Sequence, residues 1–517
     1  MRSANSRPEE LLAASHLAVN SRRNVAAFIV AIAAQFLVVP LVISDIGLTA
    51  FGHAGLVLAV WAPLALIGTV IGQAATREIS AALAAGRVAG ALQSSAIALC
   101  ATGGVVAALV FVAVGPSVLA WLDSSGVSEA DWSTLVLASV PGWFCQQLVV
   151  VMQGVASARQ DFRLVAKMSI ATAVSGVICT LGAVYLRPDA VGYLSGVSAG
   201  FVLTSIVSGF MVRDPGAPAP SARGSLADAA RSLLGFSRWQ SVYQATGTIG
   251  NQVDRYLLAS LASPAVIGQF NAANRLQEAA YMLVMKAAEV LFPRFGARSL
   301  EEPQERLRFF LIASWAVTSL SGVVLAPLII LAEPLMRLWA GAETAAGGAV
   351  LLQVLTVGGL IGCGTTVFTY YMMGMGETRP LAAISALYSV LTVIFSALAM
   401  LALGPMVAGA GLALASVVRV MVSMIWTRFR TFPTSSWSDL LNCTVVPLAA
   451  SLAVCVFSAG HIAGSGIDSW WELAVAGVIV VPSVAVSVLA ASALSGFGRS
   501  AVSAVMGGLV VSMRGRV

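Results

Sequence analysis

Long apolar runs alternate with short polar breaks along nearly the whole of this chain. A bilayer core about 30 Å thick requires about 20 helical residues at a rise of about 1.5 Å each, and each run reaches that length. Because lipid offers no hydrogen-bond partner to backbone N–H and C=O groups, an uninterrupted run of this length satisfies its backbone as an α-helix. The pattern therefore predicts an all-α polytopic membrane protein.

The apolar runs predict about fourteen transmembrane helices. Of the 517 residues, 58% are hydrophobic and only 10% are charged, which is more apolar surface than soluble domains of this length can bury. The expected spans are residues 24–44, 54–76, 90–114, 133–156, 165–186, 191–212, 239–261, 274–293, 309–332, 348–372, 381–403, 407–426, 441–460 and 472–494.

Cations in the loops predict the orientation of the chain, because Lys and Arg in short loops favour the cytoplasmic side. The loop cations fall in every second loop, and only Arg187 and Arg337 lie in loops of the opposite side. No cleavable signal pattern precedes the first apolar run. We therefore expect a multi-pass protein of the inner (plasma) membrane with both termini in the cytoplasm. The net charge of +6 follows from this bias and requires no nucleic acid as a partner.

The chain repeats itself, as transporters often do. Met, Gly and Arg recur at the same positions in Met152–Arg159 and Met372–Arg379, which close the fourth and tenth spans at an offset of 220 residues. Two six-helix halves of the same orientation follow. The expected organisation is a cytoplasmic segment 1–23, an N-terminal six-helix bundle 24–212, a cytoplasmic linker and entry helix 213–238, a C-terminal six-helix bundle 239–426, two extra transmembrane helices 427–494 and a cytoplasmic tail 495–517.

Motifs for catalysis, for metals and for nucleotides are missing from the sequence. The six Cys and three His are scattered, which predicts no metal site, and no phosphate-binding loop appears. A membrane-embedded polymerase, ligase or glycosyltransferase would need an external catalytic loop. The longest outward loops, near 115–132 and 333–347, contain no His and no paired acidic motif. We therefore expect a protein that is not an enzyme.

Polar side chains inside the seventh span form the strongest candidate site, because an ionisable group at membrane depth requires partners or a wet cavity. At about 100° per residue these side chains fall within an arc of about 120°, so that one face of the helix is polar. Asp254 and Arg255 are adjacent and therefore splayed, which predicts contacts with neighbouring helices. The polar residues of this face include Gln240, Gln244, Asn251, Asp254 and Arg255.

The eighth span carries Glu278, Lys286 and Glu289 within an arc of about 80°, and Lys286 is placed to pair with Glu289. We expect this face to meet the polar face of the seventh span. The charged residues of both spans either line a cavity or form a buried network that fixes helix register. Arg419 in the twelfth span either faces the same cavity or extends to the membrane interface.

The first half of the chain offers weaker candidates. Gln35 in the first span and Gln146 and Gln147 in the fourth span could bind sugar hydroxyls, or could bond across helices. Trp143, one turn earlier, could stack on a sugar ring or face lipid. Pro40, Pro63 and Pro141 are expected to kink their helices, and glycines at positions 68 and 72 suit close contact between helices.

The order and placement of five motifs carry a resemblance that covers nearly the whole chain. They are Gly154–Arg159, Asp254–Tyr256, Val266–Arg275, Phe292–Arg294 and Gly374–Arg379. With the twelve-plus-two helix layout, they resemble the multidrug/oligosaccharidyl-lipid/polysaccharide (MOP) exporter superfamily, and within it the polysaccharide branch of Wzx-type flippases. The resemblance implies two six-helix bundles that open alternately to either side of the membrane around a central cationic cavity.

The implied cargo is an oligosaccharide linked to undecaprenyl pyrophosphate. A pyrophosphate at membrane depth needs fixed cations, which Arg255, Lys286 and Arg419 could supply. Asp254 and Glu289 are candidates for coupling to a proton or sodium gradient, without any other cofactor. The expected partners are the cargo, membrane lipids, and the polymerase and glycosyltransferases of the same pathway.

Other members of the superfamily suggest two alternatives, a lipid II flippase and a MATE-like drug or cation antiporter. Lipid II flippases usually carry more Arg through the first bundle, whereas the first six spans here hold none at depth. A drug or cation antiporter would require acidic groups without neighbouring cations. Arg255 and Lys286 fit that requirement poorly.

Overall fold

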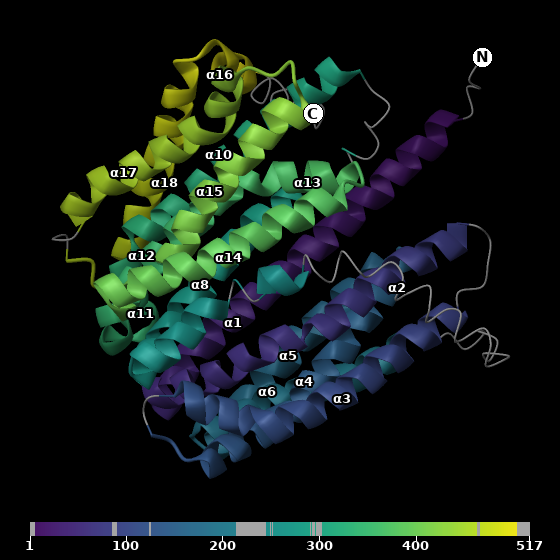
Figure 1. The fold of residues 1–517 in the computed structure, drawn as a ribbon, viewed down its shortest axis with the longest axis vertical. Helices are drawn as coiled ribbons and strands as arrows, with labels where there is room; N and C mark the ends of the chain where they lie inside the picture. Colours follow the sequence, from purple (N-terminus) through teal and green to yellow (C-terminus); the bar gives the residue numbers. More distant parts are fainter. Residues whose placement is uncertain are drawn as a thin grey trace. The chain divides into compact units, whose positions relative to one another are not determined.

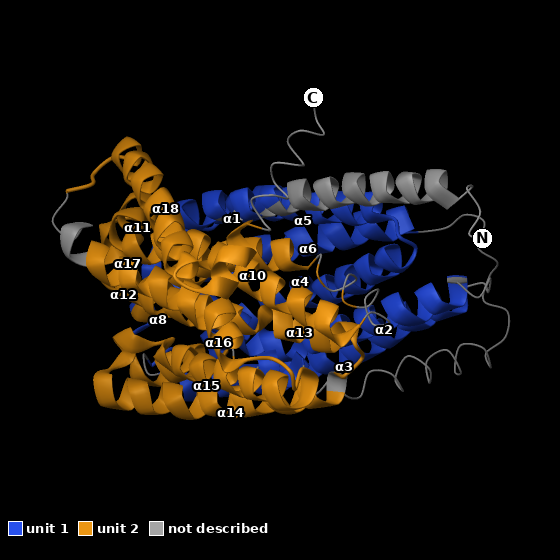
Figure 2. Cartoon of the chain, turned by 90° about the horizontal axis from the view of Figure 1, so that it is seen from above, with its two compact units in different colours: residues 1–248, 263–265 blue, residues 249–262, 266–517 orange. Residues whose placement is uncertain are grey.

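The computed structural model describes residues 6–84, 90–123, 126–212, 244–248, 250, 252–289, 291, 295, 302–462 and 466–503. The elements formed by these residues are helices (Figure 1). They belong to two compact units, one made of residues 1–248 and 263–265 and the other of residues 249–262 and 266–517 (Figure 2). The boundary lies close to the seventh expected span.

The helices of unit 1 are α1 (Ser6–Leu64), α2 (Leu66–Ala84), α3 (Gly90–Leu122), α4 (Glu129–Ala158), α5 (Phe162–Leu186) and α6 (Ala190–Val212). Those of unit 2 are α8 (Pro264–Ala288), α10 (Pro303–Ile330), α11 (Ala332–Ala340), α12 (Ala342–Gly362), α13 (Thr366–Gly374), α14 (Thr378–Leu403), α15 (Ala410–Trp426), α16 (Trp437–Leu440), α17 (Val446–Ile462) and α18 (Trp470–Ala493).

Eleven helices in the described part of the chain are long and apolar enough to cross a membrane. The expected spans without a separate counterpart among them are 54–76, 239–261 and 274–293. The first is divided between α1 and α2, much of the second lies outside the described residues, and the third falls in α8, which carries charged residues along its length. The all-helical membrane fold is confirmed, and the count of fourteen stays a prediction.

Two breaks shape the start of unit 1. Gly47 has φ 79° and ψ 161°, a conformation that favours glycine, and it interrupts the helical path of α1 between the first two expected spans. The helix is interrupted again at Ala65, two residues after Pro63. Because proline lacks an N–H, the bond from position 63 to the carbonyl oxygen of Ala59 is missing from the ladder just before this break.

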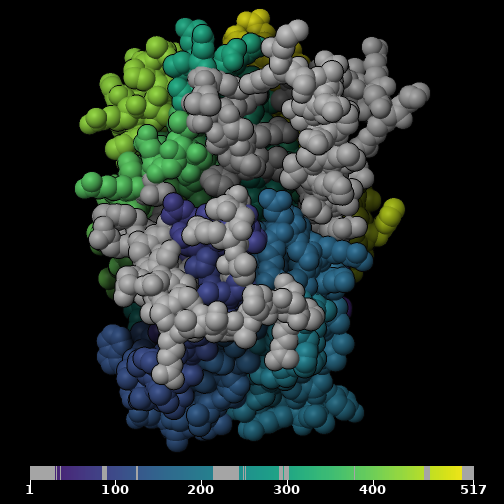
Figure 3. All heavy atoms as spheres, turned by 90° about the vertical axis from the view of Figure 1, so that its right-hand side faces the viewer, coloured from purple at the N-terminus to yellow at the C-terminus, as the bar shows by residue number. Residues whose placement is uncertain are grey.

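Glycines allow α2 to approach α4 closely in unit 1. A Cβ atom at Gly154 would lie 2.5 Å from the carbonyl oxygen of Gly72, and one at Gly68 would lie 2.5 Å from Gln147 Oε1. Thr76 Oγ1 donates to the carbonyl oxygen of Gly154 at 3.0 Å across the same contact. The expected role of Gly68 and Gly72 in close helix packing is therefore confirmed. The atoms of unit 1 (purple to blue) pack closely on the face shown in Figure 3.

The two C-terminal helices, α17 and α18, pack against α10 in unit 2 (Figure 1). Trp315 Nε1 donates to Ser492 Oγ at 2.9 Å, and Thr318 Oγ1 donates to the carbonyl oxygen of Cys443 at 2.9 Å. Both hydrogen bonds are buried. On the loop before α18, Asp468 forms an ion pair with Arg337 of α11 at 3.0 Å. The two extra helices are therefore an integral part of unit 2.

Candidate functional site

Arg255 lies on the helical segment 252–261, which is joined to α8 by a short turn. Its Nε donates to Asn271 Oδ1 at 2.9 Å, and Nη1 donates to Gln252 Oε1. The guanidinium carbon lies 5.7 Å from the centre of the Phe270 ring. The expectation that Arg255 contacts a neighbouring helix is confirmed, because Asn271 and Phe270 both belong to α8.

Asp254, the preceding residue, points to different helices. Its side chain is 4% exposed and lies beside the Ser396 hydroxyl of α14 and the backbone N–H of Gly409. Gly409, with φ 98°, is the N-cap of α15, where the partial positive charge of a helix N-terminus favours a carboxylate. In the described part of the chain, Asp254 Oδ1 has no hydrogen-bond partner. A buried carboxylate oxygen without a partner is suited to receive a proton or a small cation.

Ser396, which lies beside this carboxylate, belongs to a stripe of hydroxyl side chains on α14 that sequence analysis missed. All its members are buried, and their spacing of four, three and four residues places them on one helix face. A Cβ atom at Gly250 would lie 3.1 Å from Ser389 Oγ, so the seventh span packs directly on the stripe. The members are Ser385, Ser389, Thr392 and Ser396. Their regular spacing was the available signal.

Arg419 on α15 faces the interior of unit 2. Its guanidinium carbon lies 5.0 Å from the centre of the Tyr388 ring on α14, and Nη2 lies 3.4 Å from Thr369 Oγ1 on α13. The side chain is half-buried, and the choice between a cavity lining and the membrane interface stays a prediction. In the described residues, no carboxylate lies within ion-pair distance of Arg255 or Arg419.

Lys286 and Glu289 form the expected pair on α8, with Nζ and Oε2 2.9 Å apart. Both side chains are exposed, at 46% and 58%, and Glu278 is exposed on the same helix. Because α8 is one continuous helix, Lys286 lies about 22 Å along its axis from Asn271, at 1.5 Å per residue. The structure does not bring Lys286 together with Arg255, and the two cations are too far apart to hold one phosphate group.

Two of the candidates of unit 1, Gln147 and Trp143, are buried on α4. Gln147 is 1% exposed and its Oε1 accepts the backbone N–H of Gly68 at 3.0 Å, so it bonds across helices. Trp143 is completely buried, and its Nε1 has no partner among the described residues. It can neither stack on a sugar nor face lipid, and both expectations for it are wrong. Gln146 is half-buried on α4.

The remaining expected site residues lie on the first and seventh spans. Gln244 is half-buried in a short helical stretch. Gln240 and Asn251 lie outside the described residues, as does the side chain of Gln35. Their proposed roles remain predictions.

Comparison with known proteins identifies the family of this chain. The model of the polysaccharide biosynthesis protein family matches residues 21–299, more than half of the chain. The chain belongs to this family. The matched region includes unit 1 from residue 21 onward, the seventh span with Asp254 and Arg255, and the whole of α8. A comparison with curated proteins gave no match.

Solved transporter structures share the fold. The lipid II flippase MurJ in an inward closed conformation matches with a TM-score of 0.70 at 13% identity, over 90% of this chain and 97% of MurJ. An inward-facing MATE-family multidrug resistance transporter of the MOP superfamily matches with a TM-score of 0.69 at 15% identity, over 79% and 96% of the two chains. A MOP-superfamily transporter from Pyrococcus furiosus matches with a TM-score of 0.59 at 16% identity, over 80% and 95%. These matches confirm the fold that the resemblance inferred from the sequence implied.

Proposed function

We propose that this protein flips an oligosaccharide linked to undecaprenyl pyrophosphate across the inner membrane by alternating access. The proposal rests on two arginines of unit 2, Arg255 and Arg419. Among the described residues, neither guanidinium group has a carboxylate at ion-pair distance. A cation at membrane depth without a paired anion is expensive, and an anionic cargo would compensate it. Family membership makes a polysaccharide precursor the fitting cargo.

The chemistry of the two arginines suits a phosphate group. A guanidinium binds phosphate oxygens through a planar fork of N–H donors. Arg255 uses Nε and Nη1 for Asn271 and Gln252, which leaves Nη2 for a ligand. Arg419 contacts the Tyr388 ring and makes one long contact with the Thr369 hydroxyl, so most of its N–H donors are available.

Lys286 has a different part in this proposal, because it lies about 22 Å along α8 from the level of Asn271. By the predicted orientation it is near the cytoplasmic end. There its ammonium group would exchange Glu289 for the cargo phosphate as the cargo enters, and the pair would re-form as the cargo moves on.

Asp254 is the proposed site of coupling to a proton or sodium gradient. The support is its burial, its unpartnered Oδ1 and its position at the N-terminus of α15. Glu289 is exposed and already paired with Lys286, so it is the weaker candidate. The hydroxyl stripe of α14 would supply further oxygen ligands or a path for protons.

The test is export in a strain that depends on the polymer. We expect Arg255→Gln and Arg419→Gln to lose export while still inserting into the membrane. Arg187→Gln is the matched control, because Arg187 is 59% exposed and pairs with Asp189 in a loop of unit 1. Unchanged export by both test variants at normal membrane levels would reject the cationic site.

A lipid II flippase is the second candidate, favoured by the match to MurJ over 90% of this chain. Lipid II and the proposed cargo both present a pyrophosphate, so the same arginines would serve either. Rescue of cell-wall synthesis in a strain lacking its lipid II flippase, without rescue of polysaccharide export, would favour this alternative. The proposed partners, a polymerase and glycosyltransferases, apply to the first candidate only.

A further inference from the structure

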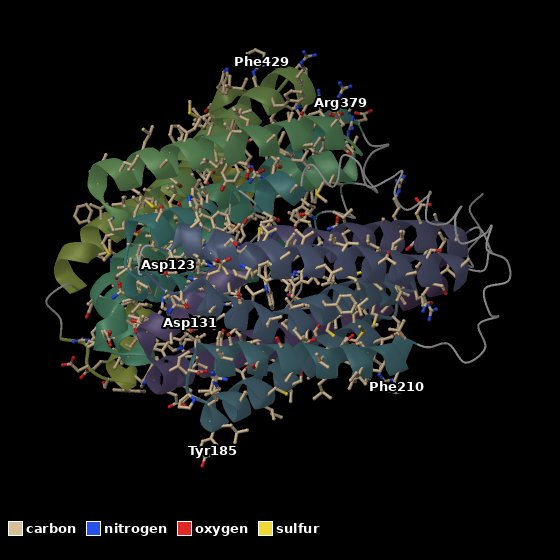
Figure 4. The ribbon with its side chains drawn as sticks, turned by 60° about the horizontal axis from the view of Figure 1, so that its bottom comes forward. Asp123, Asp131, Tyr185, Phe210, Arg379 and Phe429 are labelled. Atoms are coloured by element: carbon tan, nitrogen blue, oxygen red, sulfur yellow. The ribbon has the colours of Figure 1, made fainter. Side chains whose placement is uncertain are left out.

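An aromatic and basic patch lies on the turn that connects α15 to α17. We define the α15–α17 patch as Arg428, Phe429, Arg430 and Trp437. Phe429 is 63% exposed and Trp437 is 41% exposed, and their rings contact each other with centroids 6.1 Å apart. Phe429 lies at the outer edge of unit 2 (Figure 4). Exposed apolar rings on a membrane protein are stabilised by contact with lipid.

The backbone holds these rings outward. Residues Thr427–Thr431 form a π-helical turn after α15, and the next residue, Phe432, is only 3% exposed. The Phe432 ring packs against Tyr371 at 5.2 Å and Phe310 at 5.5 Å, which anchors the turn in the core. Arg428 Nη1 donates to the carbonyl oxygen of Pro433 across the same turn. The buried Phe432 ring and the hydrogen bond from Arg428 therefore fix the conformation of the turn that carries the patch.

The charge of the patch is not balanced within the described chain. Neither Arg428 nor Arg430 has an ion pair among the described residues, and the Arg428 guanidinium lies 5.8 Å from the centre of the Phe429 ring. Asp439 is half-buried on α16 and forms no ion pair with either arginine among the described residues.

The patch lies between the ends of two candidate membrane spans. The apolar stretch that contains α15 ends at Thr431, and the stretch that contains α17 begins at Trp437. Tryptophan prefers the headgroup level, and anionic lipids attract arginine at the same level. The orientation predicted from loop charge places this boundary on the cytoplasmic side.

We propose that the α15–α17 patch binds the phosphodiester headgroup of an anionic phospholipid in the cytoplasmic leaflet. Arg428 and Arg430 hold the phosphate, and the rings of Phe429 and Trp437 insert beside the glycerol and upper acyl chain. The bound lipid fixes the depth of the turn that joins the second six-helix bundle to α17 and α18. This inference is independent of the cargo and would hold for either candidate function.

The test measures retained lipid on the full-length protein, purified in nanodiscs that contain phosphatidylglycerol and phosphatidylcholine in equal amounts. We expect wild-type protein to enrich phosphatidylglycerol. Arg428→Gln combined with Arg430→Gln should lower that enrichment about thirtyfold at this site, at about 1 kcal/mol for each basic residue near a surface. Native mass spectrometry of the released protein counts the retained lipids.

The matched control is Arg163→Gln combined with Lys167→Gln, which removes two exposed cations from the start of α5 without touching an aromatic pair. Enrichment that falls equally in both double variants would reduce the effect to net charge and overturn the proposal, as would unchanged enrichment in the patch variant. Preference of the wild-type patch for undecaprenyl phosphate over phosphatidylglycerol would also overturn it, in favour of a docking site for the cargo. Phe429→Ala separates the contribution of the ring, because a surface substitution of this kind leaves the core intact.

Discussion

Substituting Arg255 by glutamine and by lysine separates a cargo-binding role from a structural one. Glutamine removes the charge, whereas lysine keeps the charge and loses the planar fork. If Arg255 holds a phosphate, the two variants should differ in transport. If Arg255 only fixes the register of the seventh span against α8, they should behave alike.

The magnitudes follow from the contacts of Arg255. A hydrogen bond to a charged group contributes about 1.5–3 kcal/mol, and a cation over a ring contributes about 0.5–1 kcal/mol. Both variants lose the bond to Asn271 and the geometry over Phe270, so each should lower the free energy of unfolding by about 2–4 kcal/mol. Only Arg255→Gln also loses the phosphate bond, which should raise the cargo concentration for half-maximal flipping about 10- to 150-fold.

The assay is flipping of the lipid-linked oligosaccharide in proteoliposomes that hold equal amounts of folded protein. Thermal unfolding of the purified variants supplies the stability term separately. Equal half-maximal cargo concentrations in wild type, Arg255→Gln and Arg255→Lys would refute the reasoning and leave Arg255 as a packing residue.

Three further outcomes are expected. Asp254→Asn should abolish the response of flipping to an imposed proton or sodium gradient in proteoliposomes, and a response equal to that of wild type would remove Asp254 from coupling. Gly154→Ala should lower the free energy of unfolding by about 1–3 kcal/mol, because its Cβ would press on Gly72, whereas Gly182→Ala faces open space and should not; equal melting temperatures for both would contradict the close contact. Trp143→Phe should leave cargo affinity unchanged, since the side chain is buried and its Nε1 bonds to nothing described; weaker cargo binding in a folded variant would count against this.

The membrane helices could be predicted from the sequence because lipid imposes the rule residue by residue. Each span must be helical and apolar, and neither condition depends on the rest of the fold. The eighth span shows the limit of the pattern. α8 begins at Pro264, ten residues before the expected start at 274. The expected start was too late because polar Gln269 and Asn271 interrupt the apolar run. Each is satisfied at one end of its amide, because Gln269 Nε2 donates to the carbonyl oxygen of Glu343 and Asn271 Oδ1 accepts from Arg255.

The candidate site could be predicted only in part, for a related reason. Charged residues such as Asp254 and Arg255 stand out in an apolar span, so their importance was visible. Which way each side chain points depends on tertiary packing, which hid the burial of Trp143 and the contact between Arg419 and Tyr388. Small hydroxyl residues are common in membrane helices, and the stripe on α14 carried no signal besides its spacing.

The most direct test of the account is flipping by the purified protein itself. Vesicles that contain the wild-type chain are given undecaprenyl-pyrophosphate-linked oligosaccharide on one side, and the sugar that becomes accessible on the other side is measured with a membrane-impermeant lectin. The account predicts rapid transfer by wild type, and transfer at the protein-free rate by the double variant Arg255→Gln and Arg419→Gln. Folded wild-type protein that leaves the oligosaccharide where it was, or a double variant as fast as wild type, would contradict it.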